Sequence, residues 1–399
     1  MRHWILRRQL VIACAGAGKS ERIINEAISN YRQKKRSLIL TYTDCNQKQI
    51  IKRISKALGA VPGEIAVKGW FTFLLEDMIR PYQSHILENR VAGLNFNETD
   101  PHKRSGYTIK GRSEKHSSGK YNHMHFVTDP GHKAHSTYLS KLACRIAEES
   151  KVTRKQGRRT IKFGSAAERL EEIYDTVFID EVQDLVGWDF EVLKSLSASE
   201  SLDITCVGDF RQTIYQTANA QKHPKTNSDK RARFKELGFT EVSMNFSRRS
   251  VLEICEFSDL IHEGSGYPPT GSKVALPSIS EENAKHIGVF AVNPKHFRAY
   301  QEYFNPTILR HSINSGVQYC VGREAFNFGQ AKGMTFARTL ILPTEPQMMF
   351  LRGNRAPLES GTTDKAVNAF YVASTRAQYS VAFLIDGLVS VKGVTMWTP

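Results

Sequence analysis

Short hydrophobic runs and amphipathic segments alternate along the first part of the chain. A short apolar run is typical of a buried strand, and apolar residues that recur every three or four positions are typical of a helix. The runs lie at 9–13, 37–43 and 64–68, and helices are expected to follow them at 20–28, 44–58 and 70–80. Strands that alternate with helices predict a parallel sheet with both faces covered.

The alternation is interrupted between residues 95 and 165, where only 138–147 shows clear helical spacing, and then returns. Strands are expected at 175–180, 203–207, 287–292, 339–342 and 380–385, and helices at 167–173, 251–261, 296–304 and 366–377. A turn-rich linker at 268–277 separates two groups of elements. We therefore expect an α/β protein with two domains and an insertion in the first. The expected boundaries are 1–94 and 166–262 for the first domain, 95–165 for the insertion and 263–399 for the second.

The first strand leads into a small-residue turn that ends in Lys19 and Ser20. The turn fits the phosphate-loop pattern G-x-x-x-x-G-K-[ST], except that Ala13 stands at the first glycine position. A G-K-S tripeptide often occurs by chance, but a strand, a turn and a helix together favour a nucleotide site. Backbone amides would face the phosphates, Lys19 would reach the β- and γ-phosphates, and the Ser20 hydroxyl would bind Mg²⁺. The residues expected to bind nucleotide are Ala15, Gly16, Ala17, Gly18, Lys19 and Ser20.

The apolar strand that begins at residue 175 ends in two acidic residues, Asp180 and Glu181. Asp180 would hold Mg²⁺ through water, and Glu181 would act as the general base that polarises the attacking water. An acidic pair after a strand often only caps a helix, but here it follows a phosphate loop. Gln212 comes just past the next strand, where it would sense a γ-phosphate or serve as an ordinary polar loop residue.

The positive charge of the chain is concentrated in the insertion. Residues 101–165 hold 15 Lys and Arg against 4 Asp and Glu, an excess of 11 out of the net +15 of the whole chain. Such a segment is either a nucleic-acid-facing subdomain or a solvated loop. The residues singled out for DNA contact are Arg154, Lys155, Arg158 and Arg159. Six histidines also lie here without zinc-finger spacing or paired cysteines, so no metal site is expected.

The six cysteines are scattered, and no C-x-x-C pair occurs among them. Several lie in apolar runs, which indicates core residues in a reducing compartment and predicts a cytoplasmic protein. The basic and apolar start resembles a secretory signal, but it runs directly into the phosphate loop, so cleavage would destroy that loop. No apolar run approaches the roughly 18 residues of a membrane span.

Seven segments, in this order, resemble the motifs of superfamily 1 helicases of the UvrD/Rep/PcrA type. They are Ala13–Ser20, Thr41–Asp44, Asp180–Asp184, Gly208–Tyr215, Asn245–Ser250, Ala331–Phe336 and Tyr371–Ala377. The resemblance implies two RecA-like P-loop NTPase domains with ATP and Mg²⁺ in the cleft between them. It also implies 3′-to-5′ movement on single-stranded DNA, or on a duplex with a single-stranded end.

The resemblance assigns roles to individual residues. It implies that Gln212 senses the γ-phosphate and that Arg249 and Arg376 act as arginine fingers, which agrees with the need for cations around a phosphoryl-transfer transition state. The residues that it implies for DNA contact are Thr41, Tyr42, Thr43 and Tyr215.

Several motif positions depart from the family pattern. The upstream glutamine motif that reads adenine has no counterpart, and Thr217–Ala220 replaces the segment whose tryptophan stacks on a base. Thr335 stands where a glutamate contacts the sugar, and Asn327–Gly329 replaces T-x-H. With about 120 residues after the linker, the large duplex-engaging insertion of processive relatives has no room. The chain therefore looks similar to shortened UvrD-like proteins of phages and mobile elements, and to helicase subunits of Gabija-type antiphage systems beside an OLD-like nuclease.

Two functions from different classes remain open. One is a DNA-dependent ATPase that translocates on DNA and unwinds it, in antiviral defence with a nuclease partner. The other is a nucleotide-gated regulatory subunit that binds DNA and a nuclease with little unwinding. The departure at 217–220 favours the second, whereas Lys19, Glu181, Gln212 and Arg376 favour the first. A P-loop kinase does not fit Asp180–Asp184 or the final arginine motif.

Overall fold

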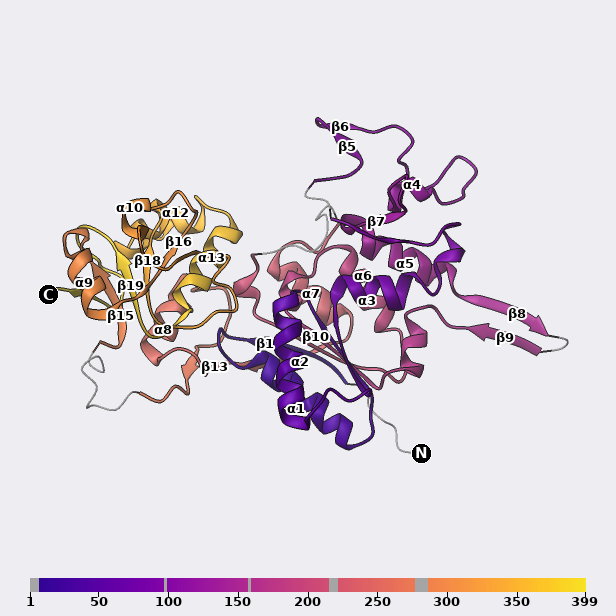
Figure 1. Ribbon diagram of the computed structural model, residues 1–399, viewed down its shortest axis with the longest axis horizontal. Helices are drawn as coiled ribbons and strands as arrows, with labels where there is room; N and C mark the ends of the chain where they lie inside the picture. Colours follow the sequence, from indigo (N-terminus) through magenta and orange to yellow (C-terminus); the bar gives the residue numbers. More distant parts are fainter. Residues whose placement is uncertain (1–6, 97–98, 157–158, 215–221, 277–285) are drawn as a thin grey trace. The chain divides into compact units, whose positions relative to one another are not determined.

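The computed structural model describes residues 7–96, 99–156, 159–214, 222–276 and 286–399. The chain divides into two compact units (Figure 1). Unit 1 comprises residues 1–11, 20–208 and 215–242, and unit 2 comprises residues 12–19, 209–214 and 243–399. The phosphate loop and the segment around Gln212 therefore belong to unit 2, together with the C-terminal half of the chain.

A six-stranded sheet forms the framework of unit 1. The strand order is β12-β1-β11-β10-β2-β3, and β11, β10, β2 and β3 run parallel. The bounds are β1 Arg8–Ala13, β2 Ser37–Thr41, β3 Ile65–Gly69, β10 Thr176–Asp180, β11 Asp203–Gly208 and β12 Thr240–Met244. Val177, Phe178 and Ile179 of β10 are almost completely buried, as expected for a strand covered on both faces.

Helices flank this sheet. Their bounds are α1 Lys19–Arg32, α2 Asp44–Leu58, α6 Trp188–Leu196 and α7 Asn227–Glu236. Helix α2 covers the predicted range because both of its ends are encoded locally. The side chain of Thr43 accepts a hydrogen bond from the amide of Asn46, and Gly59 closes the helix with a positive φ of 84°.

The predicted insertion is built from short elements. They are β4 Gly93–Asn95, β5 Lys103–Arg104, β6 Tyr107–Thr108, α4 His123–Phe126, β7 Lys133–His135, α5 Leu139–Glu149, β8 Val152–Gln156 and β9 Arg159–Phe163. Helix α5 is amphipathic, and Leu139, Leu142 and Ile146 are fully buried on one face. Within the insertion, the ring of His102 contacts the rings of His125, His135 and Tyr138, and these four residues form a small aromatic cluster.

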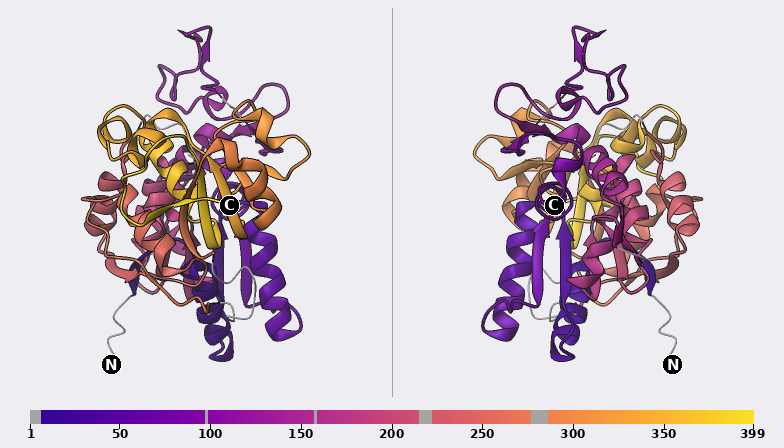
Figure 2. Two further views of the ribbon diagram at one scale, coloured as in Figure 1. Left: turned by 90° about the vertical axis from the view of Figure 1, so that its left-hand side faces the viewer. Right: turned by 90° about the vertical axis from the view of Figure 1, so that its right-hand side faces the viewer.

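Unit 2 contains a second six-stranded sheet, in which every neighbouring pair is parallel. The order is β17-β16-β18-β19-β15-β20. The bounds are β15 Gly288–Val292, β16 Thr307–Arg310, β17 Ala325–Asn327, β18 Phe336–Leu342, β19 Ala377–Leu384 and β20 Val394–Trp397. Helices lie on both sides of the sheet (Figure 2), namely α8 Leu252–Ile261, α9 Phe297–Phe304, α10 Val317–Cys320, α11 Glu345–Leu351, α12 Ala356–Glu359 and α13 Asp364–Ser374.

Two parallel sheets flanked by helices confirm the predicted α/β class with RecA-like domains. Three predicted helices differ in detail. Segment 70–80 is a single α-turn, α3 Trp70–Phe73, continued by a π-helix at Leu74–Ile79, and segment 167–173 is a 3₁₀-helix at Glu168–Glu172. The last helix stops at Ser374, because the Thr375 hydroxyl donates to the carbonyls of Tyr371 and Val372. Arg376 therefore lies just beyond the helix. The three domain boundaries drawn from the sequence stay a prediction.

None of the helices within the described residues is long and apolar enough to cross a membrane.

Candidate nucleotide site

The phosphate loop in unit 2 requires glycine at a tightly packed position. Gly16 and Gly18 both have positive φ, 73° and 85°. A Cβ atom on Gly16 would lie only 2.5 Å from Cβ of Arg249 and 2.7 Å from Oγ of Ser247. The Gly16 carbonyl also accepts a hydrogen bond from the amide of Arg248 at 2.8 Å. The arginine segment at 248–249 therefore packs directly against the backbone of this loop.

Two oxygen-bearing side chains meet at the end of β10 in unit 1. The Ser20 hydroxyl donates to Oδ2 of Asp180 at 2.9 Å, and Oδ1 of Asp180 accepts from the amide of Glu181 at 2.9 Å. Asp180 is fully buried. A hydroxyl and a carboxylate suit a hard cation such as Mg²⁺, which normally takes few protein ligands and completes its shell with water and phosphate. The described residues contain no cluster of three or more His, Cys, Asp or Glu that could hold a metal ion.

Glu181 is held in an unusual backbone conformation. Its φ is +56°, in the left-handed region that non-glycine residues rarely adopt. Strain of this kind costs on the order of 1–3 kcal/mol and gathers at functional sites. Oε2 of Glu181 accepts a hydrogen bond from Nε2 of Gln183. Gln183 is itself confined, because a Cβ on Gly208 would approach its Oε1 to 2.5 Å.

Lys230 is a buried contributor to this region that the sequence pattern did not reveal. Its Nζ donates to the carbonyl of Gln183 at 2.6 Å, and only 1% of the residue is exposed. It lies on α7, in a stretch that reads as a basic polar connector. A buried lysine cannot be distinguished from its exposed neighbours by composition, so no local signal identifies it.

Gln212 is fixed from one side by Asp209 in unit 2. Nε2 of Gln212 donates to Oδ2 of Asp209 at 2.7 Å, and both side chains are buried. The Tyr371 hydroxyl lies 3.3 Å from the same oxygen and also accepts a hydrogen bond from the amide of Ala15 at 3.3 Å. Burial raises the pKa of Tyr371 well above its ordinary value, so the phenol stays protonated. Tyr371 thus connects the phosphate loop to the residue that orients Gln212.

Arg376 completes this network. Its Nη2 lies 3.3 Å from Oε1 of Gln212, its Nε donates to the carbonyl of Val372 at 2.9 Å, and only 1% of it is exposed. Arg249 reaches the same segment, since its Nη1 donates to the carbonyl of Thr375 at 3.3 Å. Unit 2 therefore connects Gln212, Arg249 and Arg376. These are the three residues that the resemblance to helicases assigns to the γ-phosphate.

Cys14 lies inside the phosphate loop and is buried. Burial, with a smaller effect of the neighbouring Asp209 carboxylate, raises the pKa of its thiol to about 12. The thiol is therefore uncharged at neutral pH and packs as a small apolar side chain beside Ala13 and Ala17. Cys144, Cys206 and Cys255 are buried too, as expected for core residues, whereas Cys45 is exposed and Cys320 is half-buried, so the expectation was wrong for these two.

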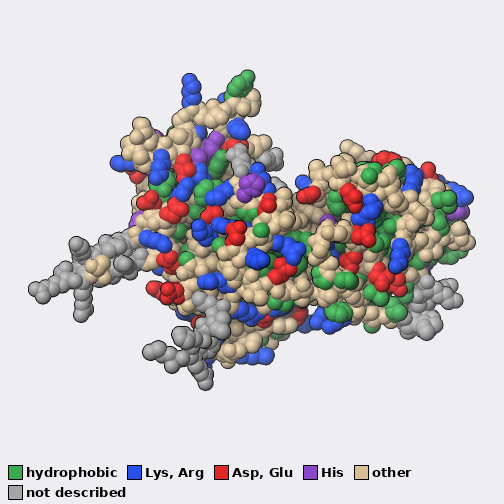
Figure 3. All heavy atoms as spheres, turned by 180° about the vertical axis from the view of Figure 1, so that it is seen from behind, with side chains coloured by type: hydrophobic (Ala, Val, Ile, Leu, Met, Phe, Trp, Pro, Cys, Tyr) green, Lys and Arg blue, Asp and Glu red, His purple; other side chains and the backbone are tan. Residues whose placement is uncertain are grey.

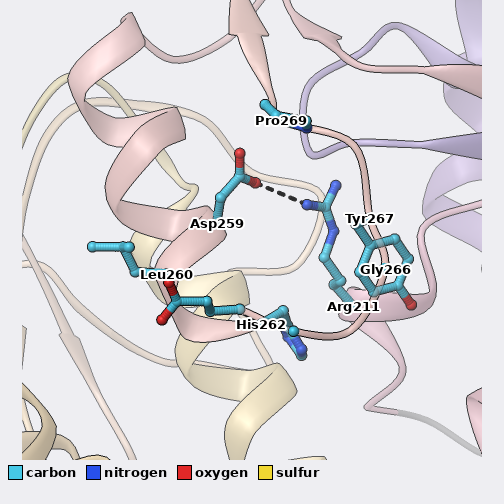
Figure 4. Close-up of a pocket in the computed structure, with 9 residues that line it drawn as sticks. Arg211, Asp259, Leu260, His262, Gly266, Tyr267 and Pro269 are labelled. Carbon is cyan, nitrogen blue, oxygen red and sulfur yellow. Dashed lines mark hydrogen bonds and ion pairs between the residues drawn. The ribbon is translucent and has the colours of Figure 1, made fainter.

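A pocket of about 230 Å³ lies on the other side of Arg211 in unit 2 (Figure 4). Arg211 pairs with Asp209 at 3.2 Å and with Asp259 at 3.0 Å, so it stands between the pocket and the Gln212 network. Burial lowers the pKa of His262 at the pocket wall to about 4, which leaves this ring neutral. The remaining lining residues include Leu260, Glu263, Gly266, Tyr267 and Pro269.

The residues predicted to contact DNA lie on separate elements, as far as they belong to the described residues. Thr41 is fully buried at the end of β2, Tyr42 stacks on Trp70 with ring centroids 5.8 Å apart, and the exposed Thr43 caps α2. Arg154 and Lys155 lie on β8 and Arg159 begins β9. Tyr215, Arg158 and the segment 217–220 lie outside the described residues. A DNA contact at these positions stays a prediction.

Residues 76–232 match the family model of the UvrD/REP helicase N-terminal domain. The matched segment is less than half of the chain, and it contains Asp180, Glu181, Gln183 and Gln212. The match supports a relationship with superfamily 1 helicases and with nucleotide use.

Among solved structures, the chain is similar in fold to an arterivirus helicase, nonstructural protein 10. The crystal structure of that protein alone gives a TM-score of 0.41 at 13% sequence identity, with 94% of this chain and 59% of that chain covered. Its complex with DNA gives a TM-score of 0.42 at 13% identity, with 95% and 60% covered. This chain therefore spans about three fifths of the length of those chains. No curated protein matches it.

Proposed function

We propose that this protein is an ATP-dependent DNA translocase or helicase of superfamily 1, which hydrolyses ATP and moves on single-stranded DNA. One observation carries the proposal. In unit 2, the amide of Ala15, the Tyr371 hydroxyl, Asp209, Gln212 and Arg376 form one continuous hydrogen-bonded chain. A phosphate loop joined in this way to a glutamine and an arginine suits an NTPase whose hydrolysis depends on both.

Each side chain has a definite task in this proposal. The loop amides and Lys19 bind the phosphates of ATP, and Ser20 and Asp180 hold Mg²⁺, which would neutralise charge on the β- and γ-phosphates. Glu181 takes the proton of the attacking water, and the hydrogen bond from Gln183 keeps its carboxylate oriented. Gln212 senses the γ-phosphate, and Arg376 and Arg249 donate to the oxygens that gain negative charge.

The direct experiment is the ATPase rate of the full chain, with and without single-stranded DNA. We expect DNA to stimulate the rate, and we expect Lys19→Ala to abolish it, because the β- and γ-phosphates lose the cation of the loop. Displacement of a labelled strand from a 3′-tailed duplex tests unwinding, and a 5′-tailed duplex tests polarity. An ATPase that DNA does not affect would overturn the translocase.

A second candidate is a nucleotide-gated regulatory subunit that binds DNA and a nuclease. Thr217–Ala220 favours it, because this segment replaces the one whose tryptophan stacks on a base in the related helicases. Under this candidate, ATP binding changes the DNA affinity while strand displacement stays absent.

We also propose that the protein works in phage defence beside an OLD-like nuclease. This extension rests on the style of the motifs in the chain. A nuclease encoded by the neighbouring gene should co-purify with the protein and cut DNA only when both are present. A neighbour of another kind would remove this extension and leave the ATPase proposal intact.

A further inference from the structure

A short β-hairpin projects from unit 1 within the insertion (Figure 1). Strands β5 and β6 pair antiparallel, with Lys103 opposite Thr108 and Arg104 opposite Tyr107. The two residues between the strands, Ser105 and Gly106, both have positive φ, 49° and 83°. Two left-handed residues in a two-residue loop are typical of a tight type I′ turn, which matches the twist of the strands and gives a stiff hairpin.

The base of this hairpin is fixed to the packed part of the insertion. The amide of Ile109 donates to the carbonyl of His102 at 2.8 Å, and the amide of Lys103 donates to the carbonyl of Asp100 at 3.1 Å. The buried His102 ring lies 4.4 Å from each of the rings of His125 and Tyr138, measured between centroids. The hairpin therefore extends into solvent from an anchored base.

Tyr107 is displayed at the end of this hairpin. It is 81% exposed, and within the described residues its side chain makes no hydrogen bond and no ring contact. Packing against the rest of the protein does not explain an aromatic residue here. Its flat ring is available on a support that restricts its movement, which lowers the entropic cost of binding a flat partner.

The surface around Tyr107 is strongly basic. Residues 101–121 contain six Lys and Arg and a single acid, Glu114. Glu114 is already paired with Lys141 at 2.7 Å and Arg145 at 2.6 Å, both on α5, so it does not neutralise the hairpin. Lys103 and Arg104 are exposed on the strand that pairs with the strand of Tyr107, and Arg104 lies directly opposite Tyr107. In the space-filling view, Lys and Arg side chains lie near a hydrophobic one at the projecting end of this unit (Figure 3).

We propose that Tyr107 stacks on an unpaired base of single-stranded nucleic acid while Lys103 and Arg104 contact the neighbouring phosphates. An aromatic face among cations is the combination that binds single strands without regard to sequence. In a duplex the bases are already stacked on one another, so a single strand is the favoured partner. The inference rests on the proposed function, and it assigns a role to an element outside the seven helicase-like motifs.

The test uses the full chain and a fluorescein-labelled oligothymidine, with fluorescence anisotropy as the measurement. Tyr107→Ala should weaken binding roughly 5- to 150-fold, the loss expected for one stacked base, without changing the salt dependence. Tyr107→Phe should retain most of the affinity, because the ring remains. Replacing Lys103 and Arg104 with Gln should instead lower the slope of log K against log salt by about 1.4, at about 0.7 for each phosphate contact.

Tyr303→Ala is the matched control, since Tyr303 is 63% exposed in unit 2 and should not affect binding. If Tyr107→Ala binds the oligothymidine as tightly as the unchanged protein does, the inference is overturned and the proposed function stays in place. An equal loss on blunt duplex DNA would overturn stacking on an unpaired base. If the unchanged protein hydrolyses ATP but binds no DNA, the proposed translocase function is wrong. Failure of the proposed function can therefore be distinguished from failure of the stacking inference.

Discussion

Arg376 donates from Nη2 to Oε1 of Gln212 at 3.3 Å, although the two residues are 164 positions apart in the chain. Gln212 is held on its other side by Asp209, and Arg376 by the carbonyl of Val372 and the Thr375 hydroxyl. Neither side chain can move far without leaving a buried polar group without its partner, which costs about 1–3 kcal/mol. The geometry therefore favours one arrangement of the pair.

We expect Arg376→Ala to retain ATP binding and to lose DNA-stimulated hydrolysis. Loss of an arginine finger typically slows hydrolysis on the order of 10³- to 10⁵-fold. Arg376→Lys should restore little, because an ammonium group does not reproduce the planar fork of guanidinium. Nucleotide affinity and DNA-stimulated turnover are measured on the same protein. The control is Arg352→Ala, which removes only an exposed pair with Asp386. Normal stimulation in Arg376→Ala would show that Arg376 merely supports the fold.

We expect Glu181→Gln to bind ATP normally and to hydrolyse it roughly 10²- to 10⁴-fold more slowly, the usual effect of losing a general base. The amide is nearly isosteric, so the left-handed backbone at this position is retained. Single-turnover hydrolysis and nucleotide affinity are the measurements. Glu200→Gln, at an exposed position, serves as the control. Turnover close to that of the unchanged protein would exclude Glu181 as the base.

Gly16→Ala adds only one methyl group, but we expect it to lower both the stability of the protein and its affinity for ATP. The new methyl group would lie 2.5 Å from Cβ of Arg249, and overpacking of this kind costs typically about 1–3 kcal/mol. Gly59→Ala is a matched control, because Gly59 has a similar φ of 84° but no atom within 4 Å of the added Cβ. The urea midpoint of unfolding and the ATP affinity are measured for Gly16→Ala and for Gly59→Ala. Equal losses would mean that backbone strain alone, and no collision with Arg249, explains the need for glycine.

The four cations chosen from the sequence of the insertion make a separate electrostatic prediction. Replacing Arg154, Lys155, Arg158 and Arg159 with Gln should weaken DNA binding and flatten its salt dependence, because fewer counterions are released. The matched control replaces four exposed cations of unit 2, namely Lys295, Arg298, Lys365 and Lys392. An unchanged salt slope would indicate that the four residues of the insertion face solvent or a protein partner.

The histidine cluster predicts a loss of stability in acid. Burial, reinforced by the nearby His125, lowers the pKa of His102 from 6.5 to about 4, and burial also lowers the pKa values of His125 and His135. Between pH 6.5 and 4 the unfolded chain binds more protons than the folded one, so stability is present above pH 6.5 and falls as the pH drops towards 4. At about 1.4 kcal/mol per pKa unit, the fall in the pKa of His102 from 6.5 to about 4 corresponds to at most about 3.5 kcal/mol.

Urea unfolding at pH 7 and pH 5 measures this effect. His102→Phe retains the ring stack and should reduce the pH dependence, whereas His116→Phe, at an exposed position of the same insertion, should not change it. An unaltered pH dependence in His102→Phe would assign the acid sensitivity to other histidines, such as His286, whose pKa burial lowers to about 3.

The sequence by itself determined the elements whose signals are local. The continuous apolar run at 176–180 is sufficient for a buried parallel strand, and Thr43 and Gly59 mark both ends of α2. The turn before Lys19 and Ser20 could be recognised because a phosphate cradle needs its small residues at consecutive positions. Periodicity, capping and turn chemistry act over a few residues, so a single sequence encodes them directly.

Only the tertiary structure decided which distant groups meet. Tyr371 reaches Asp209 and the amide of Ala15, and Lys230 reaches the carbonyl of Gln183. The need for glycine at position 16 likewise depends on Arg249, which lies more than 200 residues further along the chain. These pairings follow from burial, because a polar group removed from water must find a partner wherever the folded chain provides one. That choice depends on the packing of whole elements, and no local pattern of residues records it.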